Sequence, residues 1–323
     1  MTTSILNLSI SGMSLRNNFE DHVDEFFDAL QESDFEYVGC PFCVRSTYRQ
    51  SLFHKKTLRI ERCDCGMVYN SRQPKQEILD KFYKESDAMK DWSVLKTTLT
   101  ECKRQDQKFD LAVRLLKNNV KSILDIGCGT GYFLSKFPQS IRRVGIDSHQ
   151  GSLDVASDNK IETYNSGIDD YLNLCLKEKT KFDAVSMWGV LEHVKNPLEV
   201  LINSARITKK NGYVLVCVPN YASAVISYHH KKTFTFQPVH LWYFTISTLK
   251  RAFSHAGINF VDTWTIEPEA RPVIRGINGF SPYDRLPQWL EDQLFTQDAL
   301  LEYEKQIISA NQGYKIVMLG KKT

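Results

Sequence analysis

The middle of the chain alternates short apolar runs, rich in β-branched residues, with longer segments of helical periodicity. The short runs lack a strict alternation of polar and apolar positions, which is typical of strands buried on both faces of a mostly parallel sheet. Helices between such strands cover the two faces. The pattern therefore predicts an α/β fold with a sheet of seven strands. The predicted strands are 122–126, 143–147, 161–164, 182–187, 213–219, 259–266 and 314–319.

The pattern differs before residue 76. Residues 1–36 predict a polar tail and then one amphipathic helix, because residues 18–32 place apolar side chains at helical spacing. Residues 37–75 carry cysteines and contain a short alternating stretch, 57–62, that predicts a hairpin. We therefore predict three parts, with a small cysteine-bearing domain between the helix and an α/β domain that runs from 76 to 323.

A long insertion separates the last two predicted strands. Residues 267–312 contain several prolines and glycines, followed by a helical stretch at 292–309. Connections of this length in a compact domain are often functional lids. The insertion is therefore a candidate lid, and the sequence does not show whether it closes over substrate.

Residues 122–134 read SILDIGCGTGYFL, a predicted strand followed by three alternating glycines and an apolar helix start. Glycines at such a turn let the backbone approach a ligand closely at the N-terminus of the next helix. Asp125 ends this strand, and a second acid, Asp147, ends the next strand about twenty residues later, a spacing that places a carboxylate on ribose hydroxyls. The turn indicates a nucleotide-type cofactor.

The third glycine distinguishes between two such cofactors. A dinucleotide loop, G-x-G-x-x-G from Gly127, would need glycine where the chain has Tyr132. The chain has G-x-G-x-G from Gly127 to Gly131, which resembles motif I of class I S-adenosylmethionine (SAM)-dependent methyltransferases. The segments VGIDSH, GIDDY, FDAVSMWGVLEHVKNP and NGYVLVCVPN match that family in the same order. The resemblance covers roughly 104–257 and implies a Rossmann-like sheet that binds SAM.

The same resemblance implies roles for single residues. The glycines would border the amino-acid end of SAM, Arg104 would meet its carboxylate, Asp147 its ribose and residues 167–169 its adenine. Met187 and Trp188 would close the pocket. The alternatives are a simple tight turn, a helix cap for Asp147, packing for Trp188 and a solvated charge for Arg104. The implied cofactor-binding residues are Arg104, Asp125, Gly127, Gly129, Gly131, Asp147, Ser148, Gly167, Ile168, Asp169, Met187 and Trp188.

Glu192 and His193 follow the fourth predicted strand, at the sheet edge where this fold opens its substrate cleft. SAM supplies an electrophilic methyl group, so the protein supplies alignment and sometimes a base. An ordinary imidazole pKa of about 6.5 makes His193 the candidate base. The string LEHV resembles ubiquinone-pathway O-methyltransferases and deoxysugar C-methyltransferases, and PVHLWYFTISTLKRAFSHAGI resembles a later segment of the family, which makes His240 a second candidate. The alternative for each is a buried histidine bonded to backbone.

The sequence favours a small-molecule acceptor, methylated on oxygen or carbon, such as a sugar, a quinone-like compound or a natural product. Methyltransferases of adenine or glutamine amines usually carry an Asn/Asp-Pro-Pro-Tyr-like motif after the fourth strand, where this chain has SMWG at 186–189. The similar letters PNY at 219–221 follow the fifth strand instead. Several basic residues could hold a phosphate or carboxylate of the substrate or form a solvated face. They are His229, His230, Lys231, Lys232, Arg271 and Arg275.

Two close cysteine pairs, Cys40 with Cys43 and Cys63 with Cys65, have the spacing of a zinc ribbon, which presents four thiolates tetrahedrally. The second pair has one intervening residue where ribbons usually have two. Four protein ligands leave no open position, so we predict a structural Zn²⁺. Disulfides are disfavoured in the cytosol. The other cysteines, predicted to lie in the core or in helices, are Cys102, Cys128, Cys175 and Cys217.

The composition of the chain bears on whether it binds nucleic acids or membranes. The formal net charge of +3 over 323 residues is too small to indicate a nucleic acid or a membrane surface, although it does not exclude RNA. No apolar run approaches the roughly 20 residues of a membrane span, and residues 1–18 lack the features of a signal peptide. We expect a cytoplasmic enzyme that does not bind membranes, and the sequence does not indicate its oligomeric state. The alternatives are an RNA methyltransferase that grips RNA with the ribbon and a non-catalytic SAM-binding module.

Overall fold

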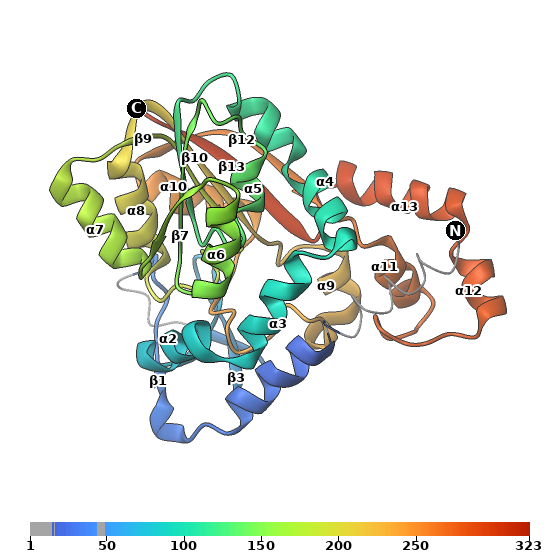
Figure 1. The fold of residues 1–323 in the computed structure, drawn as a ribbon. Coiled ribbons are helices and arrows are strands. Elements are labelled where there is room, and N and C mark those ends of the chain that lie inside the picture. Colours follow the sequence, from blue (N-terminus) through green and yellow to red (C-terminus); the bar gives the residue numbers. More distant parts are fainter. Residues whose placement is uncertain (1–14, 16, 44–48) are drawn as a thin grey trace.

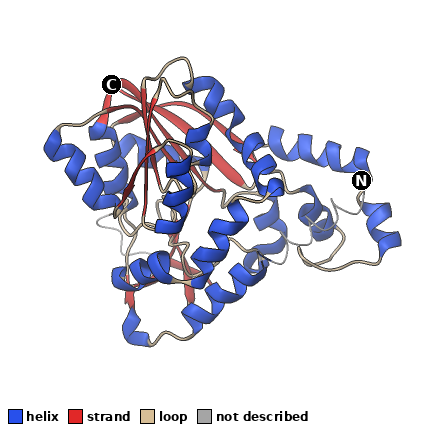
Figure 2. Cartoon of the chain, viewed as in Figure 1, coloured by secondary structure: helices blue, strands red, loops and turns tan. Residues whose placement is uncertain are grey.

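A seven-stranded sheet lies at the centre of the molecule (Figures 1 and 2), whose computed structural model describes residues 15, 17–43 and 49–323. The strand order is β12-β13-β10-β9-β6-β7-β8. The pairs from β10 to β8 are parallel, and β13 is antiparallel to both of its neighbours. The predicted seven-stranded, mostly parallel sheet is confirmed. Its strands are β6 (Ser122–Ile126), β7 (Arg142–Asp147), β8 (Glu162–Asn165), β9 (Phe182–Trp188), β10 (Thr208–Pro219), β12 (Ile258–Ile266) and β13 (Lys315–Lys322).

The central strands are apolar at successive positions because both faces of the sheet are buried. On β6, for example, Ile123 packs into one core cluster and Leu124 into another, and both side chains are fully buried. One face is covered by α7 (Ile168–Glu178), α8 (Pro197–Ile207) and α10 (Ile246–His255) (Figure 1). The opposite face is covered by α4 (Leu99–Leu116), α5 (Tyr132–Ser135) and α6 (Gln150–Asp158).

Three helices from the N-terminal part form a layer that we call the cover. It consists of the helix at 17–28, α2 (Gln76–Glu85) and α3 (Asp87–Lys96). Its core joins Phe19, Val23 and Phe27 of the first helix to Phe82 of α2. The helix predicted at 18–32 thus ends at residue 28, and a short 3₁₀ turn, η1 (Glu32–Asp34), follows it.

The cysteine segment, residues 37–75, is joined to the rest of the molecule by a shared sheet. Its four strands follow the order β11-β4-β3-β2, and β11 comes from a much later part of the chain. The hairpin predicted around 57–62 is formed by β2 and β3. Cys63, Met67 and Tyr69 belong to the same core cluster as the central sheet, so residue 76 marks a change of secondary structure and not a gap between two cores. The strands are β1 (Phe35–Tyr37), β2 (Arg49–Lys55), β3 (Leu58–Cys63), β4 (Val68–Asn70), β5 (Arg72–Pro74) and β11 (Trp242–Tyr243).

Residues 267–312 form α11 (Ala270–Ile277), α12 (Gln288–Leu294) and α13 (Gln297–Ser309). These helices extend to one side of the sheet (Figure 1), and α11 packs against α13 and against α9 (Ala224–His229). A second 3₁₀ turn, η2 (His230–Lys232), follows α9. Within the described part of the chain, no helix combines the length and the apolar character needed to cross a bilayer.

Candidate active site

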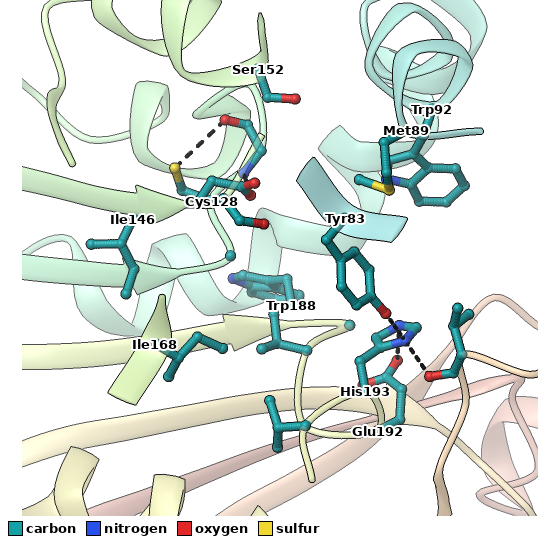
Figure 3. A pocket seen from close by; sticks show the side chains of 18 of the residues that line it. Tyr83, Met89, Trp92, Cys128, Ile146, Ser152, Ile168, Trp188, Glu192 and His193 are labelled. Atoms are coloured by element: carbon teal, nitrogen blue, oxygen red, sulfur yellow. Dashed lines mark hydrogen bonds and ion pairs between the residues drawn. The ribbon is translucent and has the colours of Figure 1, made fainter. Parts of the chain in front are cut away.

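A cavity of about 580 Å³ lies between the carboxyl ends of the central strands and the cover. Figure 3 shows Ile146 and Ile168 at one end, and Tyr83 pointing its hydroxyl towards His193 at the other. The cavity brings together most residues that the sequence assigned to a site. These are Arg104, Asp125, Gly127, Gly129, Asp147, Ser148, Gly167, Ile168, Asp169, Trp188, Glu192, His193 and His240.

The glycine turn at 127–131 needs its glycines for two reasons. Gly127, Gly129 and Gly131 have φ values of 68°, 52° and 72°, in the left-handed region that favours glycine. A Cβ atom on Gly127 would also lie 2.5 Å from Cγ2 of Val190, and one on Gly131 would lie 2.5 Å from Cδ1 of Ile161. Gly131 does not line the cavity. It allows the turn to pack against Ile161 on the side away from the cavity.

Asp147 is fixed by the same turn. One carboxylate oxygen accepts the backbone N–H of Gly129 at 2.9 Å, and the other accepts the N–H of His149 at 2.9 Å. Burial raises the pKa of Asp147, and these backbone donors oppose that rise. Each oxygen keeps a lone pair for a further donor. The carboxylate is therefore held in place with acceptor capacity left for the hydroxyls of a ribose.

Asp125 is the second acid at the turn. Its side chain is almost fully buried, and Oδ1 accepts the hydroxyl hydrogen of Ser186 at 2.7 Å. Burial raises the pKa of Asp125 to about 7, although the Ser186 hydrogen bond opposes the shift. Met187, expected to close the pocket together with Trp188, is fully buried in the core and does not line the cavity. That expectation is corrected, because alternate residues of β9 face opposite sides of the sheet.

On α4, the residue available to meet the SAM carboxylate is not the predicted Arg104. Arg104 lines the cavity, but its Nη2 lies 2.6 Å from Glu267 Oε2 and 3.7 Å from Glu269 Oε1. Burial acts to lower the pKa of Arg104, but these carboxylates outweigh it, so its charge is already neutralised. Lys108, one helical turn further on, also lines the cavity and makes no hydrogen bond or ion pair with the described residues. Lys108 is therefore the more available amine, although burial lowers its pKa.

Trp188 provides a second unpartnered donor at this wall. Its indole Nε1 is buried without an acceptor among the described residues, and Nζ of Lys108 lies 5.3 Å from the centre of its ring. The ring packs at 4.6 Å from that of Phe109, measured between centroids. A free ammonium beside an unpartnered N–H complements an anionic group, such as the carboxylate of SAM.

His193 is held in one orientation by its Nδ1 atom. This nitrogen lies 2.8 Å from the carbonyl oxygen of Val239 and 2.9 Å from the hydroxyl of Tyr83. A carbonyl can only accept, so we assign the ring hydrogen to Nδ1, which leaves a lone pair on Nε2. Burial lowers the pKa of His193 to about 4, which keeps the ring neutral near pH 7. A neutral imidazole with a free Nε2 can accept a proton, but a pKa of about 4 makes His193 a weaker base than the ordinary value of about 6.5 implied.

Glu192 lies beside this lone pair. Its Oε1 is 3.8 Å from Nε2 of His193, and its buried Oε2 has no hydrogen-bond partner among the described residues. Burial raises the pKa of Glu192 to about 7. The carboxyl group therefore changes its charge close to neutral pH.

His240 lies close to His193, with 4.7 Å between ring centroids, but it is less available. Its Nδ1 donates to the carbonyl of Thr235 at 2.7 Å, and its Nε2 accepts from Nε2 of Gln237 at 3.1 Å. Both ring nitrogens are thus engaged, which favours His193 as the base. The ligand atoms of Glu192, His193 and His240 lie within 4.8 Å of one another, so this donor set could also hold a divalent cation.

The four cysteines of the cysteine segment converge. The sulfur atoms of Cys40, Cys43, Cys63 and Cys65 lie within 4.8 Å of one another. The turn that carries the second pair is closed by a 2.7 Å hydrogen bond from the N–H of Gly66 to the carbonyl of Cys63. Four clustered thiols are the donor set that zinc prefers, so the residues fit the predicted ion. Cys128, Cys175 and Cys217 are buried, as predicted; Cys102 lies on α4.

Comparison with known proteins places this geometry in a family. The family described as methyltransferase domain matches residues 101–263, half of the chain. The chain belongs to the methyltransferase-domain family. The ubiquinone biosynthesis O-methyltransferase of Dechloromonas aromatica (strain RCB) is 33% identical over 106 residues, which cover 31% of this chain and 45% of that protein. The protein of the same description from Ruegeria sp. (strain TM1040) is 29% identical over 153 residues, 43% of this chain and 61% of its own.

Among solved structures, a SAM-dependent methyltransferase from Archaeoglobus fulgidus superposes with a TM-score of 0.50. At 18% identity, the match covers 72% of this chain and 99% of that one, and it shows the shared fold. The chain spans about half the length of the first curated relative that it matches. The Rossmann-like methyltransferase fold expected from the sequence is confirmed.

Two expectations about the surroundings of this methyltransferase-domain site are revised. The described residues of 267–312 contribute no side chain to the lining, whereas the cover contributes Phe19, Tyr83 and Trp92. The six basic residues proposed to bind a substrate anion do not line the cavity either. Arg275 donates instead to Glu291 at 2.8 Å. Tyr314 and Lys315, which follow the insertion, do line the cavity, so the insertion ends beside the cavity without contributing a side chain to it.

The side chains of the site that the sequence did not indicate include Tyr83 and Lys108. Tyr83 comes from a helix whose position depends on tertiary packing, and no local motif marks it. Lys108 could have been found, because it follows Arg104 by four positions and therefore lies on the same face of α4.

Proposed function

We propose that the protein transfers a methyl group from SAM to an oxygen or carbon atom of a small-molecule acceptor. One observation carries the proposal: His193, whose Nδ1 faces the carbonyl of Val239, lines the same cavity as the glycine turn and Asp147. A cofactor cradle and a base in one cavity are what methylation of a hydroxyl group or an acidic carbon requires.

SAM would occupy the end of the cavity nearest the turn. The residues at 127–131 would border its amino-acid part, Asp147 would accept its ribose hydroxyls, and 167–169 would adjoin its adenine. Lys108, with the N–H of Trp188, would bind its carboxylate, the role that the sequence gave to Arg104. When bound, SAM supplies the electrophilic methyl group.

The residues at the other end would prepare the acceptor. Nε2 of His193 would remove the proton from the acceptor, and the charged imidazole would be stabilised by the carboxylate of Glu192, whose Oε1 lies 3.8 Å away. Since Nδ1–H already points at a carbonyl, the hydroxyl of Tyr83 can present only its oxygen to that nitrogen. Its own hydrogen is then available to an oxygen of the acceptor.

The cover favours an acceptor that is small and partly apolar. Phe19, Met89 and Trp92 line the cavity from this side, and rings of this kind pack against a sugar face or a quinone-like ring and exclude water. A sugar, a quinone-like compound or a natural product would fit this wall. The roof formed by the cover argues against an RNA strand as the acceptor.

The four-cysteine cluster would hold a structural Zn²⁺. The sulfur atoms converge within 4.8 Å, and zinc bound to four thiolates has no open position for catalysis. Free thiols persist in a reducing compartment, which supports a cytoplasmic location. Elemental analysis of purified protein should find one zinc per chain, and none in a variant with serine at Cys40 and Cys65.

The deciding experiment is incubation of purified protein with SAM labelled in its methyl group, together with either a metabolite extract or total RNA. Label in small molecules is the expected result. Label in RNA would replace this proposal with the RNA-methylating alternative. Calorimetric binding of SAM without any turnover would favour a non-catalytic module, and the absence of SAM binding would overturn the proposal.

A further inference from the structure

We propose that the cysteine segment, residues 37–75, is a positioning element for the acceptor end of the cavity, so that metal binding by its thiols fixes Glu192 and His193. This inference rests on the proposed function. It assigns the segment a role inside the enzyme instead of a grip on an external partner. Three sets of contacts carry it.

The first contact joins the cysteine segment to β11. Tyr69 of β4 pairs with Trp242 in antiparallel register, and their ring centroids lie 5.9 Å apart. The backbone N–H of Asn70 donates to the carbonyl of Leu241 at 3.0 Å. In the four-stranded sheet β11 has β4 as its only neighbour, so within the described residues β4 alone supports it there.

The second contact joins β11 to the catalytic pair. The N–H of Leu241 donates to the carbonyl of Glu192 at 2.8 Å, and the indole N–H of Trp242 donates to the carbonyl of Val194 at 2.6 Å. These two carbonyls lie on either side of His193. The backbone that carries the base is therefore fastened at both sides to residues 241–242, which follow His240 directly.

The third contact bypasses β11. Nζ of Lys195 donates to the carbonyl of Pro74 at 3.0 Å and forms a 2.7 Å ion pair with Glu36. It ties the end of the 188–195 loop to β5. The loop is thus linked to the segment by two routes, indirectly through Leu241 to Asn70 and directly to Pro74.

The cysteines control the strand from which this chain of contacts starts. Cys63 ends β3, and its N–H donates to the carbonyl of Met67 at 2.9 Å across the turn that leads into β4. Binding one ion to all four thiols would fasten this turn to the Cys40–Cys43 loop. A segment this small gains much of its rigidity from such a cross-link. Removal of the ion should therefore loosen β4, then β11, and then the backbone around His193.

The cofactor end shares an apolar core with the cysteine segment, but it lies outside this path of hydrogen bonds. Among the described residues, no hydrogen bond joins the cysteine segment to the glycine turn or to Asp147, which are held by β6, β7 and each other. Loss of the metal should disturb the acceptor end and leave SAM binding intact. General destabilisation of the protein, by contrast, would disturb both ends of the cavity.

Hydrogen exchange, followed by mass spectrometry on the full-length protein, tests this directly. Zinc-loaded protein is compared with chelator-treated protein and with Cys65→Ser, and Cys175→Ser on α7 serves as the buried-thiol control. Amides in peptides spanning 188–196 and 238–245 should exchange at least about tenfold faster without zinc. The peptide spanning 122–131 should be unchanged, and the calorimetric SAM affinity should stay within twofold.

A second variant, Trp242→Phe, removes the indole N–H but keeps an aromatic ring against Tyr69. It should retain zinc and speed exchange in 188–196 alone. Unchanged exchange in 188–196 after zinc removal would overturn the inference, and so would equal acceleration in 122–131 with loss of SAM binding. Neither readout uses an acceptor, so a failure here is distinguishable from a failure of the proposed methyl transfer.

Discussion

The Nδ1 atom of His193 lies 2.8 Å from the carbonyl oxygen of Val239, and the side chain of Val239 packs into the cover together with Phe19 and Phe27. One hydrogen bond therefore sets the tautomer of the candidate base and also ties it to the layer that closes the cavity. A residue that packs in the cover thus fixes the orientation of the His193 ring.

Replacement of the base gives the first prediction. In His193→Ala, the removal of Nε2 should lower methyl transfer at least about a hundredfold, the low end of what a general base contributes. SAM affinity should change less than threefold, because the glycine turn and Asp147 are intact. Both are measured with labelled SAM and the active metabolite fraction. His54→Ala, on an exposed position of β2, is the matched control; transfer by His193→Ala at the control's rate would remove the assignment.

The second prediction concerns stability. The pKa of Glu192 is raised by burial from 4.5 to about 7, so the folded state holds a proton that the unfolded chain releases. That contribution is complete below pH 4.5 and is lost as the pH rises through 7, a loss of roughly 3 kcal/mol in unfolding free energy. Glu192→Gln should therefore exceed the parent in stability by an amount that grows from pH 5 to pH 8.

Chemical unfolding at several pH values measures this difference. Glu178→Gln, on the exposed surface of α7, should change stability by less than about 0.5 kcal/mol at every pH. If the stability difference between Glu192→Gln and the parent does not vary with pH, the pKa of Glu192 is not raised by burial.

The pH dependence of turnover is the third prediction. The pKa of His193 is lowered to about 4, so the imidazole itself stays neutral from pH 5 upward. Protonated Glu192, below pH 7, can donate to Nε2 and no longer stabilises the imidazolium. The ratio kcat/KM should thus fall below about pH 7, and Glu192→Gln should lower the plateau and flatten this limb. A limb that survives unchanged in Glu192→Gln would assign it to another group.

The fourth prediction compares two glycines with the same left-handed backbone. Gly131→Ala places a Cβ atom 2.5 Å from Ile161, whereas Gly257→Ala, at φ 68°, meets nothing within 4 Å. Both should lose about 1–2 kcal/mol from backbone strain. Gly131→Ala should lose about 1–3 kcal/mol more from overpacking, and it should also weaken SAM binding. Thermal unfolding and calorimetry check both, and equal losses with equal SAM affinity would contradict the role of the turn.

The fifth prediction concerns the cofactor's carboxylate. Lys108→Met keeps most of the apolar stem but removes the free ammonium, so SAM should bind about ten- to a hundredfold more weakly, as expected for a lost charged hydrogen bond. Lys103→Met, exposed on the same helix, should have no effect. If Arg104→Met weakens SAM binding while Lys108→Met does not, the sequence-based assignment holds and this one fails.

The sequence predicted those features that neighbouring residues determine, and it did not predict those that depend on tertiary packing. The strand at 122–126 and the glycine turn were predictable, since the apolar run and the need for left-handed backbone are written in neighbouring residues. The roof was not. Tyr83 reaches His193, 110 positions away in the chain, because aromatic packing of the cover places α2 there. The length and proline content of 267–312 suggested a lid, but these properties do not determine where the segment lies relative to the cavity.

The cofactor cradle and the roof of the cavity come from separate stretches of the chain. The turn at 127–131 and Asp147 lie within 122–147, whereas Phe19, Tyr83 and Trp92 all precede residue 97. Substitutions in the two stretches can therefore accumulate independently of each other. We expect homologues that share this architecture to keep the former nearly constant and to diverge in the latter, so that exchange of residues 76–96 between two of them would transfer substrate preference without altering the methyl donor.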